Sequence, residues 1–273
     1  MWNDIAELSE KKLDLSYLKQ IERKKKLIHD AYDQDSIDRY IEHSDVKHIS
    51  SSLKIEGTQI SDDDTRDIYE QIMPKGIEFK TFLECHNLCT AAKMMKSQAL
   101  SGIPLTYDGL MSLHLAIASN LLSQQNSGRI RSRMVQIGRG NYEVAAINQI
   151  DKLLHRLFDR CMKIEHPVVR AAFFSYNLVS IHPFVDFNGR TSRLCESYIL
   201  VEAGYLPVDL KESEIRTYME LIRDGQEKGD RVNYEYIQFF SDLVCRKLDE
   251  VLDLLEIDYE ERTERQIQNL SVF

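Results

Sequence analysis

The chain has 273 residues and a mass of 31.8 kDa, with 43% hydrophobic and 29% charged residues. This length is enough for one ordinary domain with a full core, and the composition is that of a globular protein rather than a disordered one. Its 35 basic and 44 acidic residues give a net charge of −9, which argues against non-specific binding to nucleic acid or to an anionic membrane surface.

The cysteines and the N-terminus favour a cytoplasmic protein. The five cysteines are odd in number and have no C-x-x-C spacing, so we expect them to be reduced and to fill the core. The first residues, MWNDIAELSE, lack the apolar segment of a signal peptide, and no run of apolar residues approaches the ~18 of a membrane span. We therefore expect a cytoplasmic location and no membrane partner.

A helical pattern near residue 50 ends at a glycine. Ile49 and Leu53 have the spacing of one helix face, and Gly57 is placed to end that helix. Ser52 and Glu56 lie four residues apart and share another face, where Glu56 on pattern alone is an ordinary solvated carboxylate. The sequence SDDDTRD that follows is typical of a helix start, because its carboxylates meet the positive end of the helix dipole.

One stretch in the middle of the chain breaks the helical pattern. The sequence GRIRSRMVQIGRGNYEV, residues 128–144, alternates around Val135 and Ile137 and then meets Gly-Arg-Gly-Asn, which predicts a short β-hairpin with a loose tip. Its GRG is not a dinucleotide-binding fingerprint, since no third glycine follows and no helix begins there. The chain has no Walker A sequence either.

Helical patterns dominate the rest of the chain. Residues 147–158 form a clear amphipathic stripe, and a longer stripe covers residues 239–255. Residues 168–181 are apolar nearly all round, which predicts a helix buried at the centre of the fold. The few prolines and glycines, 5 and 11, also favour helices over many short strands.

The sequence HPFVDFNGRTSR joins this central helix to a further helical pattern. Proline disfavours helical geometry in the residue before it, so the first helix ends there, and Asn188-Gly189 readily adopts left-handed geometry. The loop amides and the free N–H groups of the second helix then point into one concavity, which suits an anion. Arg190 and Arg193 project from one face of that helix and can bind two successive phosphates.

Two further side chains add chemistry to this anion site. Asp186 supplies a hard oxygen, the ligand that Mg²⁺ prefers when it also takes oxygens from substrate phosphates. His182 titrates near neutral pH in its ordinary state and is a candidate general base. A histidine before proline is more often structural, and paired arginines are more often surface charge. Together, however, these residues indicate nucleotide-phosphate chemistry.

Residues 182–193 closely resemble the signature of the Fic-domain family, H-x-F-x-[DE]-G-N-G-R-x-x-R. The resemblance extends over roughly residues 105–240, since the hairpin is similar to the family's flap and HPVVRAAF to the helix before the motif. It implies an all-α Fic fold, a helical bundle around a central helix-loop-helix motif with one β-hairpin flap. We expect an N-terminal helical segment with an inhibitory helix at 1–65, a catalytic core at 66–245 and a C-terminal helical extension at 246–273.

The resemblance implies a protein adenylyltransferase. Such an enzyme transfers AMP from ATP to a Ser, Thr or Tyr hydroxyl of a target protein, or of itself, and releases pyrophosphate. His182 would accept the hydroxyl proton, and Asp186 would hold Mg²⁺ between the α- and β-phosphates. Asn188, with the loop amides, would stabilise charge on the α-phosphate.

The remaining nucleotide contacts also follow from the resemblance. Gly189 belongs to the nucleotide-binding loop, Arg190 would bind the β-phosphate and Arg193 the γ-phosphate. Tyr218 is similar to the family's aromatic residue near the adenine, and Gln226 follows two turns later.

Phe187 departs from the family pattern, which has Gly or Ala at this position. A residue with a Cβ costs more than glycine if the loop needs a positive φ there. Its backbone N–H can still line the nucleotide-binding loop, and we expect the ring to point out of the phosphate pocket. The substitution leaves open another nucleotide preference or a catalytically weak nucleotide-binding module.

Ser52-x-x-x-Glu56-Gly57 resembles the family's inhibitory motif, [ST]-x-x-x-E-[GN]. The resemblance implies that Glu56 forms a bidentate pair with Arg193 in place of the γ-phosphate, so that ATP binds with its α-phosphate misoriented. The same glutamate can position a water for removal of AMP in this family. An autoinhibited adenylyltransferase and a de-AMPylase therefore both remain open.

The hairpin and the C-terminus bear on partners. The flap residues Val135, Gln136, Ile137 and Gly138 would pair with an extended segment of the target through main-chain hydrogen bonds, which leave the target unnamed. The alternative is a hairpin that only covers the pocket. The charged helical residues after 245 either pack on the core or support self-association, so a homo-oligomer is left open.

Overall fold

The computed structural model describes residues 5–31, 34–136 and 144–254. These ranges contain ten α-helices and one 3₁₀ turn. In chain order they are η1 (Glu10–Lys12), α1 (Leu15–Ala31), α2 (Gln34–Ile55), α3 (Asp62–Tyr69), α4 (Phe79–Leu100), α5 (Tyr107–Ala118), α6 (Ile147–Cys161), α7 (Pro167–Ile181), α8 (Asn188–Glu202), α9 (Glu212–Lys228) and α10 (Tyr234–Leu254).

Local sequence signals explain where several helices begin and end. At the start of α3, the Ser61 hydroxyl accepts a hydrogen bond from the Asp64 N–H at 3.0 Å, which satisfies a free donor of the first turn. Pro167 stands in the first turn of α7, where its missing N–H costs nothing. Beyond the end of α2, Gly57 has a φ of +86°, and the Thr58 N–H bonds back to the Leu53 carbonyl at 3.1 Å.

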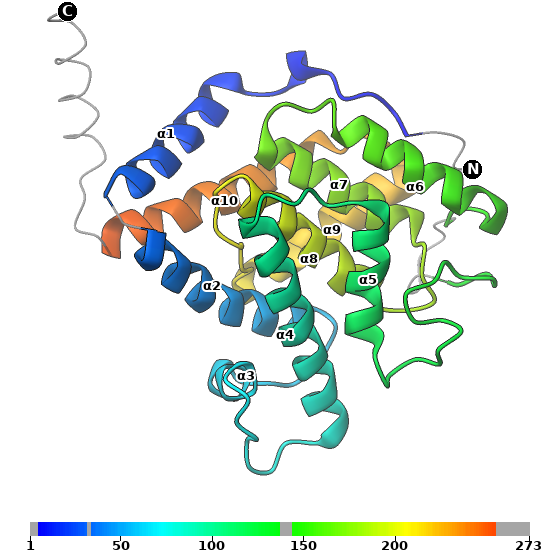
Figure 1. The fold of residues 1–273 in the computed structure, drawn as a ribbon. Helices are drawn as coiled ribbons and strands as arrows, with labels where there is room; N and C mark the ends of the chain where they lie inside the picture. The colour runs from blue at the N-terminus through cyan, green and yellow to red at the C-terminus, as the bar shows by residue number, and fades with distance from the viewer. Residues whose placement is uncertain (1–4, 32–33, 137–143, 255–273) are drawn as a thin grey trace, which may run out of the picture.

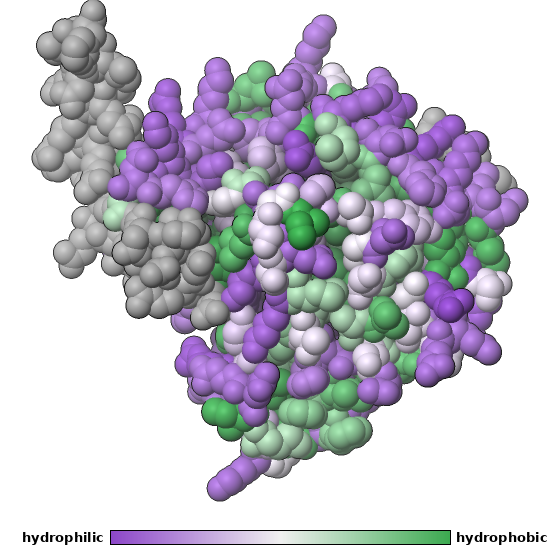
Figure 2. Space-filling view, viewed as in Figure 1, coloured by the Kyte–Doolittle hydropathy of each residue, from purple (hydrophilic) through white to green (hydrophobic). Residues whose placement is uncertain are grey.

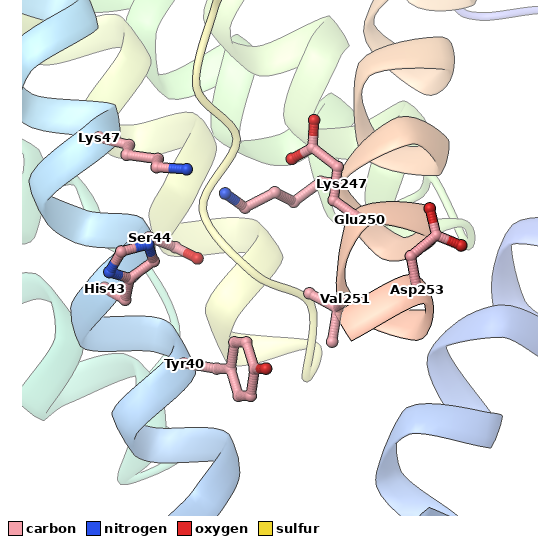
Figure 3. Close-up of a pocket in the computed structure, with 8 residues that line it drawn as sticks. All are labelled: Tyr40, His43, Ser44, Lys47, Lys247, Glu250, Val251 and Asp253. Atoms are coloured by element: carbon pink, nitrogen blue, oxygen red, sulfur yellow. The ribbon is translucent and has the colours of Figure 1, made fainter. Parts of the chain in front are cut away.

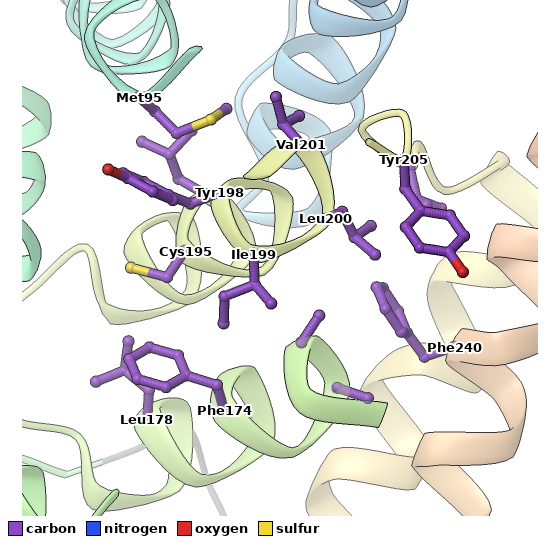
Figure 4. Close-up of a cluster of buried hydrophobic side chains, with 14 of the residues drawn as sticks. Met95, Phe174, Leu178, Cys195, Tyr198, Ile199, Leu200, Val201, Tyr205 and Phe240 are labelled. Atoms are coloured by element: carbon purple, nitrogen blue, oxygen red, sulfur yellow. The ribbon is translucent and has the colours of Figure 1, made fainter. Parts of the chain in front are cut away.

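Helices α7 and α8 lie at the centre of the molecule and pack against each other (Figure 1). Helices α4 and α5 cover α8, while α6 and α10 pack on α7. Figure 4 shows Phe174 and Leu178 of α7 facing Cys195 and Ile199 of α8, with Phe240 of α10 closing one side. All five side chains are buried, and each large apolar one stabilises the fold by about 1.5–3 kcal/mol.

The helical patterns in the sequence are confirmed, and so is the all-α fold class for the described residues. The predicted stripe at 147–158 lies within α6, the apolar segment at 168–181 within α7, and the C-terminal stripe coincides with α10 up to residue 254. The predicted hairpin is described only in part. Residues 128–136 form no strand, and 137–143 lie outside the described residues.

Hydrophilic side chains cover most of the face seen in Figure 2, with a green group at its lower end near α3 and the start of α4. Ile72, Met73 and Phe79 are the large exposed apolar residues of that region. None of the helices in the described ranges combines the length and apolar character needed to cross a bilayer.

Candidate active site

The loop between α7 and α8 is a sharp turn that local hydrogen bonds close. His182 and Phe187 both have left-handed backbones, with φ of +55° and +62°. The Asn188 side chain accepts from the Phe184 N–H at 2.9 Å and donates to the Phe184 carbonyl at 3.0 Å. Both of its polar groups therefore help to hold the loop, and the Nδ2 amide keeps a second N–H beyond the one that bonds Phe184.

His182 carries its proton on Nδ1, and its Nε2 has no hydrogen-bond partner among the described residues. Its Nδ1 lies 3.2 Å from the Val179 carbonyl, and a carbonyl can only accept, so Nδ1 is the protonated nitrogen. The pKa of His182 is lowered to about 4, chiefly by burial and also by the charge of Arg131, which together outweigh the opposing effect of that carbonyl. Nε2 thus keeps a free lone pair at neutral pH, as a general base requires.

Arg131 and His114 hold the loop from outside, and sequence reasoning missed both. The buried Arg131 donates from Nε to the His182 carbonyl at 2.8 Å, while its backbone N–H donates to the Pro183 carbonyl at 2.9 Å. His114 accepts at Nδ1 from the Gly128 N–H at 2.9 Å, so its Nε2–H donates to the Asp186 carbonyl at 3.2 Å. Its ring also stacks on Phe184 with centroids 3.7 Å apart.

Asp186 presents an exposed carboxylate at the mouth of the loop. One of its oxygens accepts from the Phe187 N–H at 2.6 Å. Within the described part of the chain, no group of three or more His, Cys, Asp or Glu side chains could form a complete metal cage. A single exposed carboxylate nevertheless fits Mg²⁺, which is commonly held by one or two carboxylates and completes its shell with waters and phosphates.

The Arg193 guanidinium is occupied by the end of α2. It donates from Nε to the Ser52 hydroxyl at 2.9 Å and from Nη2 to the Glu56 carboxylate at 2.7 Å and to the Ser52 carbonyl at 3.0 Å. The contact therefore differs from the expected bidentate pair with Glu56 alone. Ser52 takes part of the guanidinium because it lies one helical turn before the carboxylate.

Glu56 sits directly against the start of α8. A Cβ on Gly189 would clash with the Glu56 carboxylate where it now lies, so a larger residue here would displace that carboxylate. Burial raises the pKa of the Glu56 carboxyl, but the charge and hydrogen bond of Arg193 outweigh it, and the pKa lies below its ordinary value. Glu56 is thus an anion bound at a helix N-terminus, where a phosphate would also bind.

Arg190 is buried between a carboxylate and an aromatic ring. Its Nη1 donates to Glu84 of α4 at 3.1 Å, a partner that sequence reasoning missed. The Phe187 ring was expected to point out of the pocket. It is instead only 6% exposed and lies 4.3 Å from the Arg190 guanidinium carbon. A left-handed backbone at Phe187 directs the ring back over the first turn of α8, where it stacks on the cation.

The remaining predicted residues are two on α9 and the four flap residues. Tyr218 of α9 is buried with its ring centroid 6.0 Å from the Arg193 guanidinium carbon, and Gln226 donates to the Ser180 hydroxyl of α7 at 3.1 Å. Val135 is half-buried and Gln136 is exposed. The other two predicted flap residues, 137 and 138, lie outside the described ranges.

A hollow of about 420 Å³ lies away from this loop, between α2 and α10 (Figure 3). Its lining residues are Tyr40, His43, Ser44, Lys47, Lys247, Glu250, Val251 and Asp253. Lys47 and Lys247 point toward each other across it, and the carboxylates of Glu250 and Asp253 on α10 offset their charge, so its lining has no formal net charge. The candidate active site remains the loop before α8.

Comparison with known proteins gives matches to one family. Residues 104–200 match the model of the Fic/DOC family. The protein adenylyltransferase Fic of Drosophila melanogaster is 30% identical over 213 residues, which cover 74% of this chain and 41% of that protein. The Drosophila virilis protein of the same name is 29% identical over 208 residues. The chain spans about two fifths of the length of these relatives.

Solved structures show the same fold. A Fic domain containing signaling protein from Bacteroides thetaiotaomicron matches with a TM-score of 0.74 at 19% identity, over 85% of this chain and 95% of that one. Fic-1 from C. elegans matches with a TM-score of 0.73 at 21% identity, over 88% of this chain and 72% of that one.

Proposed function

The chain belongs to the Fic/DOC family through residues 104–200, and from that premise we propose that it is an autoinhibited protein adenylyltransferase. It transfers AMP from ATP to a Ser, Thr or Tyr hydroxyl of a protein and releases pyrophosphate. In this proposal residues 1–65 regulate, 66–245 catalyse and 246–273 extend the core. The single observation that carries it is His182, whose Nδ1 bonds the Val179 carbonyl and whose Nε2 has no partner among the described residues, in a loop followed by the buried Arg190 and Arg193 of α8.

The residues of the loop divide the reaction between them. The target hydroxyl oxygen attacks the α-phosphorus, its proton passes to Nε2 of His182, and the bond from the α-phosphorus to the bridging oxygen breaks as pyrophosphate leaves. General-base help of this kind contributes about 10²–10⁴ in rate. Backbone N–H groups of the turn stabilise the charge on the α-phosphate. Asp186 is the residue to hold Mg²⁺, which neutralises phosphate charge when bound.

Glu56 keeps this site inactive. The Arg193 donors that Glu56 and Ser52 occupy are the ones proposed to bind the γ-phosphate, and the Glu56 carboxylate fills the position against Gly189. A phosphate must displace a partly buried anion that already has a charge-assisted hydrogen bond. ATP then binds with its α-phosphate out of line with the target hydroxyl.

The first test is labelling with α-labelled ATP and Mg²⁺. We expect faint self-labelling in the wild type, strong labelling in Glu56→Gly and none in Glu56→Gly combined with His182→Ala. The double variant is the control for a general-base effect, since it keeps every proposed phosphate contact. Equal labelling of wild type and Glu56→Gly would exclude the inhibitory role, and retained label without His182 would exclude the proposed base.

A second candidate function uses the same residues in the reverse direction. Glu56 is ionised and lies against the loop, where its carboxylate can orient a water toward the α-phosphorus of an AMP-modified protein. Incubation of a labelled, AMP-modified substrate with wild type and Glu56→Gly separates the two. Release of AMP by wild type alone supports removal, and release by neither supports addition.

The flap completes the proposal. Residues 135–138 would pair with an extended segment of the target, a role supported by Arg131, four residues earlier, which donates to the His182 carbonyl. Replacing Val135 by proline removes one main-chain donor from such pairing. We expect weaker labelling of a target protein with unchanged nucleotide binding.

A further inference from the structure

Arg190 and Arg193 are each held by a carboxylate from a different helix. Glu56, just after α2, takes Arg193, and Glu84 of α4 takes Arg190 at 3.1 Å. The side chains of Arg190 and Glu84 are both 9% exposed, so water screens their attraction poorly. The second pair is more buried than the first, in which the Glu56 side chain is 33% exposed.

The two carboxylates are connected through Thr58. Its hydroxyl donates to the Glu84 carboxylate at 2.8 Å, at the same oxygen that binds Arg190. Thr58 is separated from Glu56 only by Gly57. One short segment after α2 therefore supplies the carboxylate that binds Arg193 and a hydrogen bond to the carboxylate that binds Arg190. Its displacement would alter the contacts of both arginines.

The Glu84 carboxylate changes how strongly Arg190 attracts a phosphate. The guanidinium keeps its shape and its other donors, and the buried Nε of Arg190 has no hydrogen-bond partner in the described structure. Its net attraction for an anion falls, however, because the charge of Glu84 offsets it at short range. Phe187 covers one face of the guanidinium at 4.3 Å, so an incoming phosphate must meet its edge.

We propose that Glu84 is a specificity-determining residue that lowers the affinity of the site for the β-phosphate of a nucleotide. The inference rests on the proposed function in one respect, the assignment of Arg190 to the β-phosphate. Glu84 acts through Arg190 and does not contact the substrate. With Glu56 removed, Glu84 still keeps the site selective for nucleotides with few phosphates.

The test compares Glu84→Gln with Glu78→Gln in the Glu56→Gly background. The first change keeps a hydrogen-bond acceptor for Arg190 and Thr58 but loses the charge. The second removes the same charge from the exposed Glu78, just before α4, without a contact to Arg190. Isothermal titration measures binding of AMP, ADP, ATP and inorganic pyrophosphate. We expect about tenfold tighter binding of ADP, ATP and pyrophosphate in Glu84→Gln, unchanged AMP binding, and no effect in Glu78→Gln.

The outcomes separate this inference from the proposed function. An ADP-to-AMP affinity ratio that stays the same or falls would overturn it, since a purely positioning role for Glu84 predicts a fall. A tighter pyrophosphate complex without any labelling from ATP would support the inference and contradict the adenylyltransferase. If Glu84→Gln loses its cooperative thermal transition, Glu84→Asp gives the second measurement. Its shorter carboxylate retreats from Arg190, and we expect a smaller rise in the same ratio.

Discussion

The loop before α8, residues 182–187, and the covering segment, residues 52–58, are held by different kinds of contact. The loop is closed by hydrogen bonds to its own backbone, over short range by Asn188 on Phe184 and over long range by Arg131 and His114, and it forms no ion pair within the described residues. The covering segment reaches Arg193 across 137 residues of sequence and binds it through charge. The difference teaches that the reactive loop is fixed by hydrogen bonds to its backbone, whereas Arg193 is occupied by a charged side chain from the end of another helix.

This contrast has an energetic basis. Left-handed backbones at His182 and Phe187 cost on the order of 1–3 kcal/mol each and persist only where many contacts determine them. An ion pair adds no such strain, but removing one partner leaves the other charge buried and unpaired. Mutations in the loop should therefore lower activity, and mutations in the covering segment should raise it.

The largest effect is expected from breaking the loop with Asn188→Ala. This change leaves the N–H and carbonyl of the buried Phe184 without partners, at a cost of about 1–3 kcal/mol for each unsatisfied group. A displacement of His182 by about 1 Å is worth about a hundredfold in rate. In the Glu56→Gly background we expect Asn188→Ala to lower the melting temperature and to reduce the labelling rate by about a hundredfold or more. Asn188→Asp keeps the bond from the Phe184 N–H, so its melting temperature and labelling rate should lie between those of Asn188→Ala and of the unchanged loop.

A smaller effect, of opposite sign, is expected from Ser52→Ala. The change removes the acceptor at Nε of Arg193 but leaves the ion pair with Glu56. Loss of one such bond is worth about 1 kcal/mol, or about fivefold in labelling rate over the wild type. Ser51→Ala is the matched control, since its hydroxyl bonds the His48 carbonyl rather than an arginine. Equal rates for the two variants would contradict a role for Ser52 in holding Arg193.

The smallest effect is expected from pH. The pKa of His182 is lowered to about 4, so the base is already neutral at higher pH, and protonation removes it only as pH falls toward that value. The pKa of Glu56 is also lowered, so the inhibitory charge is present over the same range. Labelling by Glu56→Gly, and its ratio to wild type, should stay flat from about pH 6 to about pH 8. A rise in rate centred near the ordinary histidine pKa would show that His182 is charged in the free enzyme.

Sequence reasoning located what depends on neighbours in the chain. The helix over 168–181 follows from its apolar composition, and the turn at Asn188-Gly189 follows from backbone preferences, because both signals are local. Glu84 gave no such signal. It lies 106 residues from Arg190, and beside Lys80 it looks like an ordinary helical surface pair.

The same limit applies to Arg131 and His114. Their partners are main-chain carbonyls 51 and 72 residues away, and a carbonyl has no residue identity for a pattern to detect. The direction of the Phe187 ring could not be predicted from the sequence pattern either, since the ring packs on the Arg190 guanidinium, which Glu84 holds. Long-range contacts to backbone and to preorganised charges thus had to come from the fold.

The burial of all five thiols allows one introduced surface cysteine to be labelled selectively with a fluorophore. The cysteines at 85, 89, 161, 195 and 245 are shielded, so a thiol-reactive dye reports only when the core opens. A single cysteine introduced at the exposed Lys54, on the outer side of the covering segment, would accept a fluorophore against a silent background. A change in its emission on addition of ATP would report a movement of that segment, whereas constant emission would show that ATP binds with the segment in place.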